Sequence, residues 1–493
     1  MEQLEQARKY LIDEEPEKAR EILGRLKDNP PPELTADNMW RVHELLGAYF
    51  HDTGDAEGAV QAYLNAARAD IFLRMQRQHY SNYLFALHYL DLVGGERDFS
   101  TIKRQLAAEH FAADNLYAVE TLPPPAWNHN DKIRVGYLAP QIADSAVMRF
   151  AEVMLADYDH ENFAVTVYVM EKSANEYAQN LRSKVDAWRE LAEVTWEESA
   201  QIIRRDEIDI LFDLGGHSAG GITLSVMAYR PAKRQISGIG WFDTTGLGAV
   251  DYLLSDEFLT PPGEEEFFRE KLLRLPHAFC FAPPSNILNN CGENRRGKSF
   301  VFGAMANFMK VTDDCLRTWR TICERVTDSR LILQDVTPLK SRQDYMRRRL
   351  SELSFAARVE LRPSRKNFWE DFAEIDLMLD TFPYNGGAMT ASALCAGVPT
   401  LTLRGLTYGS RFGLSILEAA GFSELVAADR QSYIKSATDL AGDRRQFEKL
   451  KRELKTKIKN SPLTDKKTYM KNLQRAYRDV ARGEPCQLRR RVV

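Results

Sequence analysis

The stretch from Asp376 to Gly405 reads DLMLDTFPYNGGAMTASALCAGVPTLTLRG and decides the fold of the chain around it. Its apolar run 377–379 predicts a buried strand, Gly386–Gly387 predicts a tight turn, and 389–396 predicts a short helix. A second apolar run, 400–403, predicts another strand. This order places unpaired backbone N–H groups and a positive helix end at the carboxyl edge of a sheet, which suits a phosphate. On spacing alone, a nucleotide-diphosphate site and an ordinary α/β connection explain the pattern equally well.

Length and charge place the chain among multi-domain globular proteins. Its 493 residues exceed what one compact core accommodates, so two or three domains are expected. The formal net charge of -4 argues against a general affinity for nucleic acid or an anionic membrane. No apolar run approaches the roughly 20 residues of a membrane span. The N-terminal MEQLEQARKY lacks the apolar core of a secretion signal. We therefore expect a cytoplasmic protein with no membrane span and no nucleic-acid partner.

The cysteines show no paired short spacing of the kind that binds zinc. They are Cys280, Cys291, Cys315, Cys323, Cys395 and Cys486. A reduced protein without a structural metal is the simplest interpretation.

The first 120 residues predict helices only, with small and aromatic residues at the spacing of a tetratricopeptide unit. The residues at that spacing are Leu46, Gly47, Phe50, Gly54, Ala59, Tyr63 and Ala66. A weaker copy lies upstream, with Ala19 forty residues before Ala59. Two units are fewer than free-standing arrays usually need. The segment is therefore either a groove that holds a protein partner or packing that supports the next domain.

Compact apolar runs alternate with helical stretches from residue 133 onward, which predicts mostly parallel sheets covered on both faces. A first series of predicted strands covers 133–138, 163–169, 209–214 and 235–241. A second series covers 299–303, 330–334, 358–361, 376–380 and 400–403.

Linker-like stretches set the predicted domain boundaries. Prolines 123–125 and the polar residues 128–131 precede the first series, and the polar stretch 289–298 precedes the second. The expected domains are a helical domain at 1–122, α/β domains at 132–284 and 298–460, and a helix with a basic tail at 461–493. In the charged region 444–482, acidic residues between the lysines favour a solvated face over nucleic-acid binding.

Several collinear motifs resemble the O-GlcNAc transferase-like proteins, glycosyltransferase family 41. The motifs are LDTFPYNGG at 379–387, AGVP at 396–399, SR at 410–411, DLGGHS at 213–218, RPA at 230–232, TTG at 244–246, DY at 251–252 and SNYLFALHY at 81–89. The resemblance covers about residues 40 to 480. It implies an α/β GT-B fold of two facing Rossmann-like domains, preceded by an all-helical tetratricopeptide-like domain.

The resemblance also implies an enzyme that transfers a sugar from a UDP-sugar to a protein side chain, with inversion and without a metal or other cofactor. The expected linkage is to a Ser or Thr hydroxyl of an acceptor protein, which the N-terminal helical region would hold. The expected alternative is a weakly active or inactive GT-B scaffold that binds a protein partner. An epimerase of the same fold is a third reading, which the helical region disfavours.

The resemblance assigns roles to individual residues. Lys310, which follows a predicted strand, matches the lysine that contacts the diphosphate, and His217 matches a histidine near the acceptor and donor. These two are the expected catalytic residues. The expected nucleotide-sugar contacts are Asn307, Lys310, Pro363, Arg365, Gly386, Gly387, Ala388, Met389, Thr390 and Ser392. The backbone amides of 387–390 would supply the helix-end donors.

The chain departs from the family pattern at five positions. Ser145 stands where many members carry a second histidine, and Ser392 replaces an acidic residue that the family uses toward the ribose. Ala388 and Met389 replace two threonines near the phosphates, and Phe368 occupies a position often held by histidine. These substitutions are the basis for the scaffold alternative.

Overall fold

The computed structural model describes residues 2–90, 99–127, 131–284, 287, 299–365 and 367–484. The chain divides into two compact units, each built from distant segments. The first unit contains 1–95, 284–417 and 422–458, and the second contains 96–283, 418–421 and 459–493. Cys291, Cys486, the linker residues 128–130 and the polar stretch 289–298 lie outside the described residues. The predicted domain boundaries therefore stay a prediction.

The first unit begins with five α-helices. They are α1 (Glu2–Ile12), α2 (Pro16–Asp28), α3 (Trp40–Thr53), α4 (Ala56–Ala69) and α5 (Leu73–Leu87). Helix α3 ends at Gly54, whose φ of 82° is left-handed, and Asp55 caps α4 by accepting from the backbone N–H of Gly58. A β-carbon at Gly47 would lie 2.5 Å from the ring of Tyr63. The small residue of α3 thus lets the aromatic residue of α4 approach, as the repeat spacing predicts.

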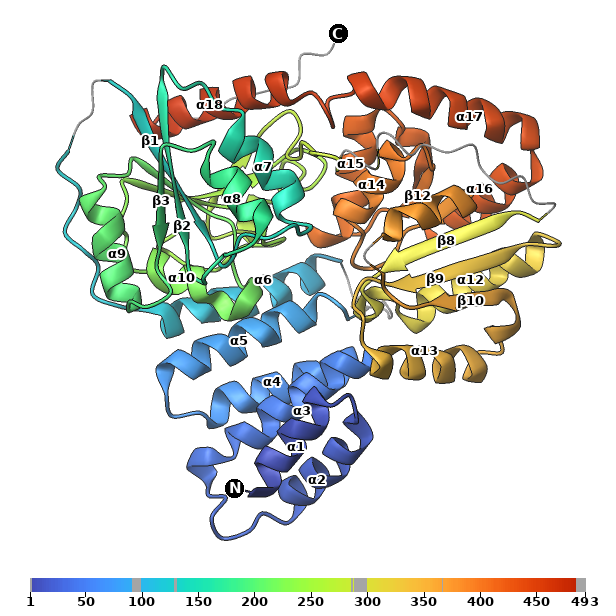
Figure 1. Cartoon of the computed structure of the whole chain (residues 1–493), viewed down its shortest axis with the longest axis horizontal. Coiled ribbons are helices and arrows are strands. Elements are labelled where there is room, and N and C mark those ends of the chain that lie inside the picture. Colours follow the sequence, from blue (N-terminus) through green and yellow to red (C-terminus); the bar gives the residue numbers. More distant parts are fainter. Residues whose placement is uncertain are drawn as a thin grey trace. The chain divides into compact units, whose positions relative to one another are not determined.

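The first unit also contains a six-stranded parallel sheet in the order β10-β9-β8-β11-β12-β13 (Figure 1). Its strands are β8 (Val301–Ala306), β9 (Arg330–Asp335), β10 (Val359–Arg362), β11 (Leu377–Leu379), β12 (Thr400–Leu403) and β13 (Val426–Ala427). Its helices are α12 (Asp313–Arg325), α13 (Lys340–Glu352), α14 (Ala388–Cys395), α15 (Phe412–Ala420), α16 (Arg430–Gly442) and α17 (Arg444–Lys457). Phe302, Trp319 and Leu377 are fully buried in its core, which explains why these strands read as continuous apolar runs.

The second unit contains a seven-stranded parallel sheet in the order β3-β2-β1-β4-β5-β6-β7 (Figure 1). Its strands are β1 (Ile133–Ala139), β2 (Phe163–Val169), β3 (Ala187–Glu190), β4 (Ile210–Asp213), β5 (Arg234–Ser237), β6 (Tyr252–Ser255) and β7 (Lys271–Arg274). Its helices are α6 (Phe99–Tyr117), α7 (Met148–Ala156), α8 (Glu176–Arg182), α9 (Trp196–Arg205), α10 (Ile222–Met227) and α18 (Lys466–Arg482).

Helix α18 shows what the charged C-terminal region does. Its face with Leu473, Tyr477 and Val480 is buried in the core of the second unit, and the hydroxyls of Tyr477 and Tyr137 lie 3.0 Å apart. The lysines and arginines of the helix lie on its other side, so an amphipathic helix completes this core. None of the described helices is long and apolar enough to cross a membrane.

The structure differs from the sequence prediction at short strands. Strands β3, β6 and β7 have four residues each, and their apolar runs are too short for a periodicity argument to find them. The predicted strand 235–241 is longer than β5, which ends at Ser237. Ile239 has a φ of 64°, and Gly240 packs directly on the backbone of Leu214, so the chain leaves the sheet there.

We predict that Gly47→Ala destabilises the helical segment by about 1–3 kcal/mol, because the buried ring of Tyr63 must move to admit a methyl group. Hydrogen exchange of the α3 and α4 amides measures this locally. Gly24→Ala is the matched control, since nothing lies within 4 Å of a β-carbon there and alanine favours a helix by up to about 1 kcal/mol. Equal losses in the two variants would contradict the packing argument.

Candidate functional site

The turn that follows strand β11 is held by the carboxylate of Asp380. Its Oδ1 accepts from the backbone N–H groups of Gly386 at 2.6 Å and Thr381 at 2.9 Å, and its Oδ2 accepts from the hydroxyl of Thr402 at 2.7 Å. A β-carbon at Gly386 would lie 2.9 Å from Oδ1, so a glycine is needed for this approach. Burial raises the pKa of Asp380 to about 6, although its hydrogen bonds and Lys310 favour the ionised form.

Helix α14 begins directly after this turn. Gly387 is its N-cap and offers no side-chain acceptor to the first-turn N–H groups of the helix. The helix ends where Gly397 adopts a φ of 79° and the N–H of Val398 bonds back to the carbonyl of Ala393 at 2.9 Å. The strand, turn and helix predicted from the sequence are therefore present, with the positive end of the helix at the carboxyl edge of the sheet.

Lys310 lies beside this turn because strands β8 and β11 are neighbours in the sheet. It ends the short 3-10 helix Phe308–Lys310, which Asn307 caps by accepting from the N–H of Met309 at 3.0 Å. The Lys310 ammonium donates to the carbonyl of Asn385 at 2.9 Å and lies 3.6 Å from the ring centroid of Tyr384. The predicted lysine and the predicted glycine turn thus meet.

The charge of Lys310 is not neutralised by an ion pair. Within the described ranges, no carboxylate lies within 4 Å of its ammonium group. Burial lowers the pKa of Lys310 to about 8, while the nearby charge of Asp380 raises it. The group is a cation at neutral pH that a bound anion would stabilise.

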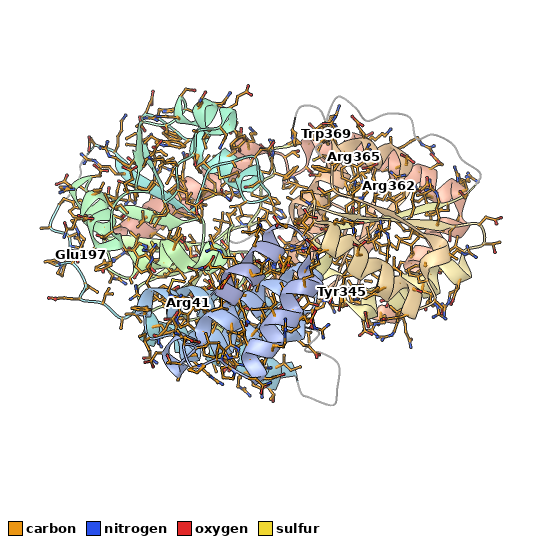
Figure 2. All side chains as sticks on the ribbon, turned by 60° about the horizontal axis from the view of Figure 1, so that its bottom comes forward. Arg41, Glu197, Tyr345, Arg362, Arg365 and Trp369 are labelled. Carbon is orange, nitrogen blue, oxygen red and sulfur yellow. The ribbon has the colours of Figure 1, made fainter. Side chains whose placement is uncertain are left out.

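Arg365 and Pro363 lie on the loop after β10, at the same sheet edge but beyond β9. Arg365 donates through Nε to Asp371 at 2.8 Å and through Nη2 to the other oxygen of this carboxylate. Asp371 is 1% exposed and also accepts from Arg362 at 2.6 Å and Gln334 at 2.9 Å. Figure 2 shows Arg362 and Arg365 near each other. Arg365 is therefore already paired, unlike Lys310.

Two of the departures from the family pattern share one environment. Phe368 and Met389 pack with Trp369 against an apolar cluster that includes Met305 and Phe372. The histidine and threonine expected there have both been replaced by apolar residues that support each other. Thr390 is buried and donates to the carbonyl of Gly386 at 3.1 Å, and Ser392 is buried on the same helix.

His217 lies in the second unit, after strand β4. Its Nε2 donates to the carbonyl of Thr245 at 2.8 Å, and its ring lies 5.0 Å from that of Trp241. Gly216, with a φ of 55°, packs directly against Trp241, which explains the glycine before the histidine. Burial, together with nearby His110, lowers the pKa of His217 to about 3. The imidazole is therefore neutral at physiological pH.

Sequence reasoning missed the residues that hold these groups in place. Glu270 is buried and accepts from the hydroxyl of Thr244 at 2.6 Å and from the N–H of Thr245 at 2.7 Å, so it fixes the loop that binds His217. Arg342 donates to Asn307, and Asp371 pairs with Arg365. A single charged residue on a helix or loop carries no local signal of such a role.

Comparison with known proteins supports the same assignment. The model of glycosyl transferase family 41 matches residues 115–294 and 293–473. The chain is 31% identical over 87% of its length to a rice protein named "Probable UDP-N-acetylglucosamine--peptide N-acetylglucosaminyltransferase SPINDLY". It is also 31% identical over 83% of its length to the Arabidopsis thaliana protein of the same name. The chain covers 47% and 46% of these two proteins, about half of each.

A solved structure resembles the chain over nearly its whole length. A mutant O-GlcNAc transferase of Thermobaculum terrenum superposes with a TM-score of 0.81 at 25% identity, covering 98% of this chain and 97% of that one. Two Rossmann-type parallel sheets after a helical segment define the GT-B class of fold, as the sequence predicts. The chain belongs to glycosyl transferase family 41.

We predict that Asp380→Asn lowers the pKa of Lys310 below its value of about 8, because the charge of Asp380 favours the ammonium form. Amine labelling over a pH series, read by mass spectrometry at Lys310, measures this. Exposed lysines, with pKa values near 10.4, are the internal standard. An unchanged labelling midpoint would show that the two groups do not interact.

Proposed function

We propose that the chain is a UDP-sugar-dependent protein O-glycosyltransferase that inverts the sugar and needs no metal ion. The names of its relatives and its family support this reaction. The observation that carries the proposal is the Lys310 ammonium, held 2.9 Å from the carbonyl that precedes the Gly386–Gly387 turn, without a carboxylate partner in the described part of the chain.

Departure of a nucleoside diphosphate leaves growing negative charge on its phosphoryl oxygens. A site without a metal must meet that charge with cations and fixed dipoles. In the proposed site, Lys310 supplies the cation and the backbone N–H groups of 387–390 supply the dipoles. These donors tolerate Ala388 and Met389 in place of threonines, because main-chain N–H groups do not depend on the side chain.

The other predicted contacts receive roles that fit their surroundings. Asn307 is proposed to contact the nucleotide beside Lys310, and Pro363 and Arg365 to lie near its base, on the loop that Asp371 holds. Ser392 takes the place of the ribose-binding acid. His217 is proposed to orient the acceptor hydroxyl, because a neutral, buried imidazole with a low pKa is a weak base.

The remaining sequence predictions are part of the same proposal. The acceptor is a Ser or Thr hydroxyl of a protein held by the helical segment, and the protein acts in the cytoplasm. The predicted division at 122, 132–284, 298–460 and 461 onward would separate the helical, acceptor, donor and C-terminal parts.

One observation favours the scaffold alternative. Phe368 and Met389 bring apolar side chains to a place where the family has polar ones, and Arg365 is already paired. A site that has lost these polar contacts would bind nucleotide weakly and still retain the fold. The same transfer experiment separates the two proposals.

We predict that the protein transfers sugar from a UDP-sugar to a co-incubated acceptor protein. Lys310→Ala should lower the rate by about 10²- to 10³-fold, the usual cost of one donor to a developing oxyanion. Intact mass spectrometry with UDP-GlcNAc, UDP-glucose, UDP-galactose and a GDP-sugar measures transfer.

The control for this experiment is Lys435→Ala, because Lys435 is 74% exposed and pairs with Asp439 on a helix surface. This variant should match the wild type. Tight binding of a partner protein without adduct from any donor would support the scaffold instead.

UDP binding should also depend on pH. Only protonated Lys310 attracts the diphosphate, and its pKa is about 8, so affinity should fall roughly tenfold from pH 7 to pH 9. Calorimetry of UDP binding over this range measures the change. Lys310→Arg keeps a cation throughout and should remove the dependence. A pH-independent wild-type affinity would exclude Lys310 as the titrating group.

A further inference from the structure

The helical segment and the C-terminal sheet belong to the same compact unit, and two side-chain connections join them at the candidate donor site. The first connection begins at Tyr89, just after helix α5. Its ring lies 5.7 Å from the ring of Tyr384, at an angle of 44°. Both side chains are buried, at 3% and 8% exposure, so this is an interior contact.

Tyr384 in turn holds Lys310. The ammonium lies 3.6 Å from the ring centroid, well inside the roughly 6 Å within which a cation is attracted to an aromatic face. On its other side the ring of Tyr384 contacts Phe412, with centroids 6.0 Å apart. The ring therefore lies between two aromatic neighbours, and its position sets where the ammonium lies.

The second connection passes through Arg342 of helix α13. This side chain is 2% exposed, and its Nη1 donates to Oδ1 of Asn307 at 2.5 Å. Its Nη2 lies 3.3 Å from Nδ1 of His51 and 3.7 Å from a carboxylate oxygen of Asp52, both on helix α3. A planar guanidinium can bond in both directions at once, which a lysine cannot do.

The two connections are separate, yet they end on Asn307 and Lys310, which bracket one short 3-10 helix. Ordinary packing between a repeat and its neighbouring domain would not need a buried arginine and a cation over an aromatic ring at the same four-residue segment. We propose that Tyr384 and Arg342 are positioning residues for Lys310 and Asn307, and that the helical segment is thereby a structural part of the donor site. This inference rests on the proposed function.

The proposal separates two roles of the helical segment. A segment that only recruits an acceptor protein would affect transfer and leave nucleotide binding unchanged. A segment that positions the donor residues must affect UDP binding when no acceptor is present.

The test measures UDP affinity by calorimetry, in the absence of acceptor, for variants of buried tyrosines in the full chain. Tyr89→Leu removes the ring that supports Tyr384 and should weaken UDP binding by about threefold to tenfold, the range expected for a lost cation–π contact. It should also move the pH midpoint of binding downward, because the ammonium form of Lys310 loses its support. Tyr89→Phe keeps the ring contact and should restore both values.

Tyr49→Leu is the matched control. Tyr49 is as buried as Tyr89, at 4% exposure, but contacts Phe50 and Glu17 within the helical segment. It should lower thermal stability without changing UDP affinity or its pH midpoint. Arg342→Lys tests the second connection and should weaken UDP binding by a similar factor, with circular dichroism confirming the fold.

Wild-type affinity and pH midpoint in both Tyr89→Leu and Arg342→Lys would overturn the inference. Equal losses of affinity in Tyr89→Leu and Tyr49→Leu would also overturn it, because general destabilisation would then explain the effect. If Lys310→Ala bound UDP as tightly as the wild type, the proposed function itself would be wrong. The first two results leave that function standing, so the failures are distinguishable.

Discussion

The hydrogen bonds of the buried Asp380 carboxylate are the interaction on which the candidate site depends. A carboxylate in the interior is costly unless donors surround it, and here two backbone N–H groups and a threonine hydroxyl do so. One of those donors is the N–H of Gly386, so the carboxylate that is stabilised also sets the course of the turn. The turn then presents the carbonyl of Asn385 to Lys310 and the start of α14 to the same space. The acidic residue after a strand, the glycine pair and the lysine from the neighbouring strand are therefore one structural feature.

The two cations assigned to the nucleotide differ in how their charge is met. Arg365 shares the carboxylate of Asp371 with Arg362, which satisfies its guanidinium and holds the loop after β10. Lys310 contacts a carbonyl oxygen and an aromatic face, which attract a cation without neutralising it. In a partly buried place of low dielectric, an unneutralised charge attracts an anion more strongly than a paired one does. This difference explains why Lys310, and not Arg365, carries the functional argument.

The helical segment shows that packing and function need not be alternatives. Its small residues, such as Gly47, serve the contact between its own helices. Tyr89, His51 and Asp52 instead reach side chains that touch Lys310 and Asn307. A segment of this kind supports the neighbouring domain, and the support falls on the residues that a nucleotide would contact. The departures at Phe368 and Met389 follow the same logic, since both replacements enter one apolar cluster.

The sequence by itself determined the features that local pattern encodes. Continuous apolar runs predicted the buried parallel strands, glycine predicted the turn before α14, and collinear motifs predicted the family and the place of Lys310 after its strand. Only the tertiary structure decided which residues hold those groups. Asp371 pairs with Arg365, Glu270 holds the loop of His217, and Arg342 reaches Asn307 from a helix 35 positions away. Such partners are single polar residues whose importance comes from burial and from the neighbours that folding brings to them. Neither burial nor long-range proximity leaves a periodic trace in the chain, because both arise only when the sheets and helices pack.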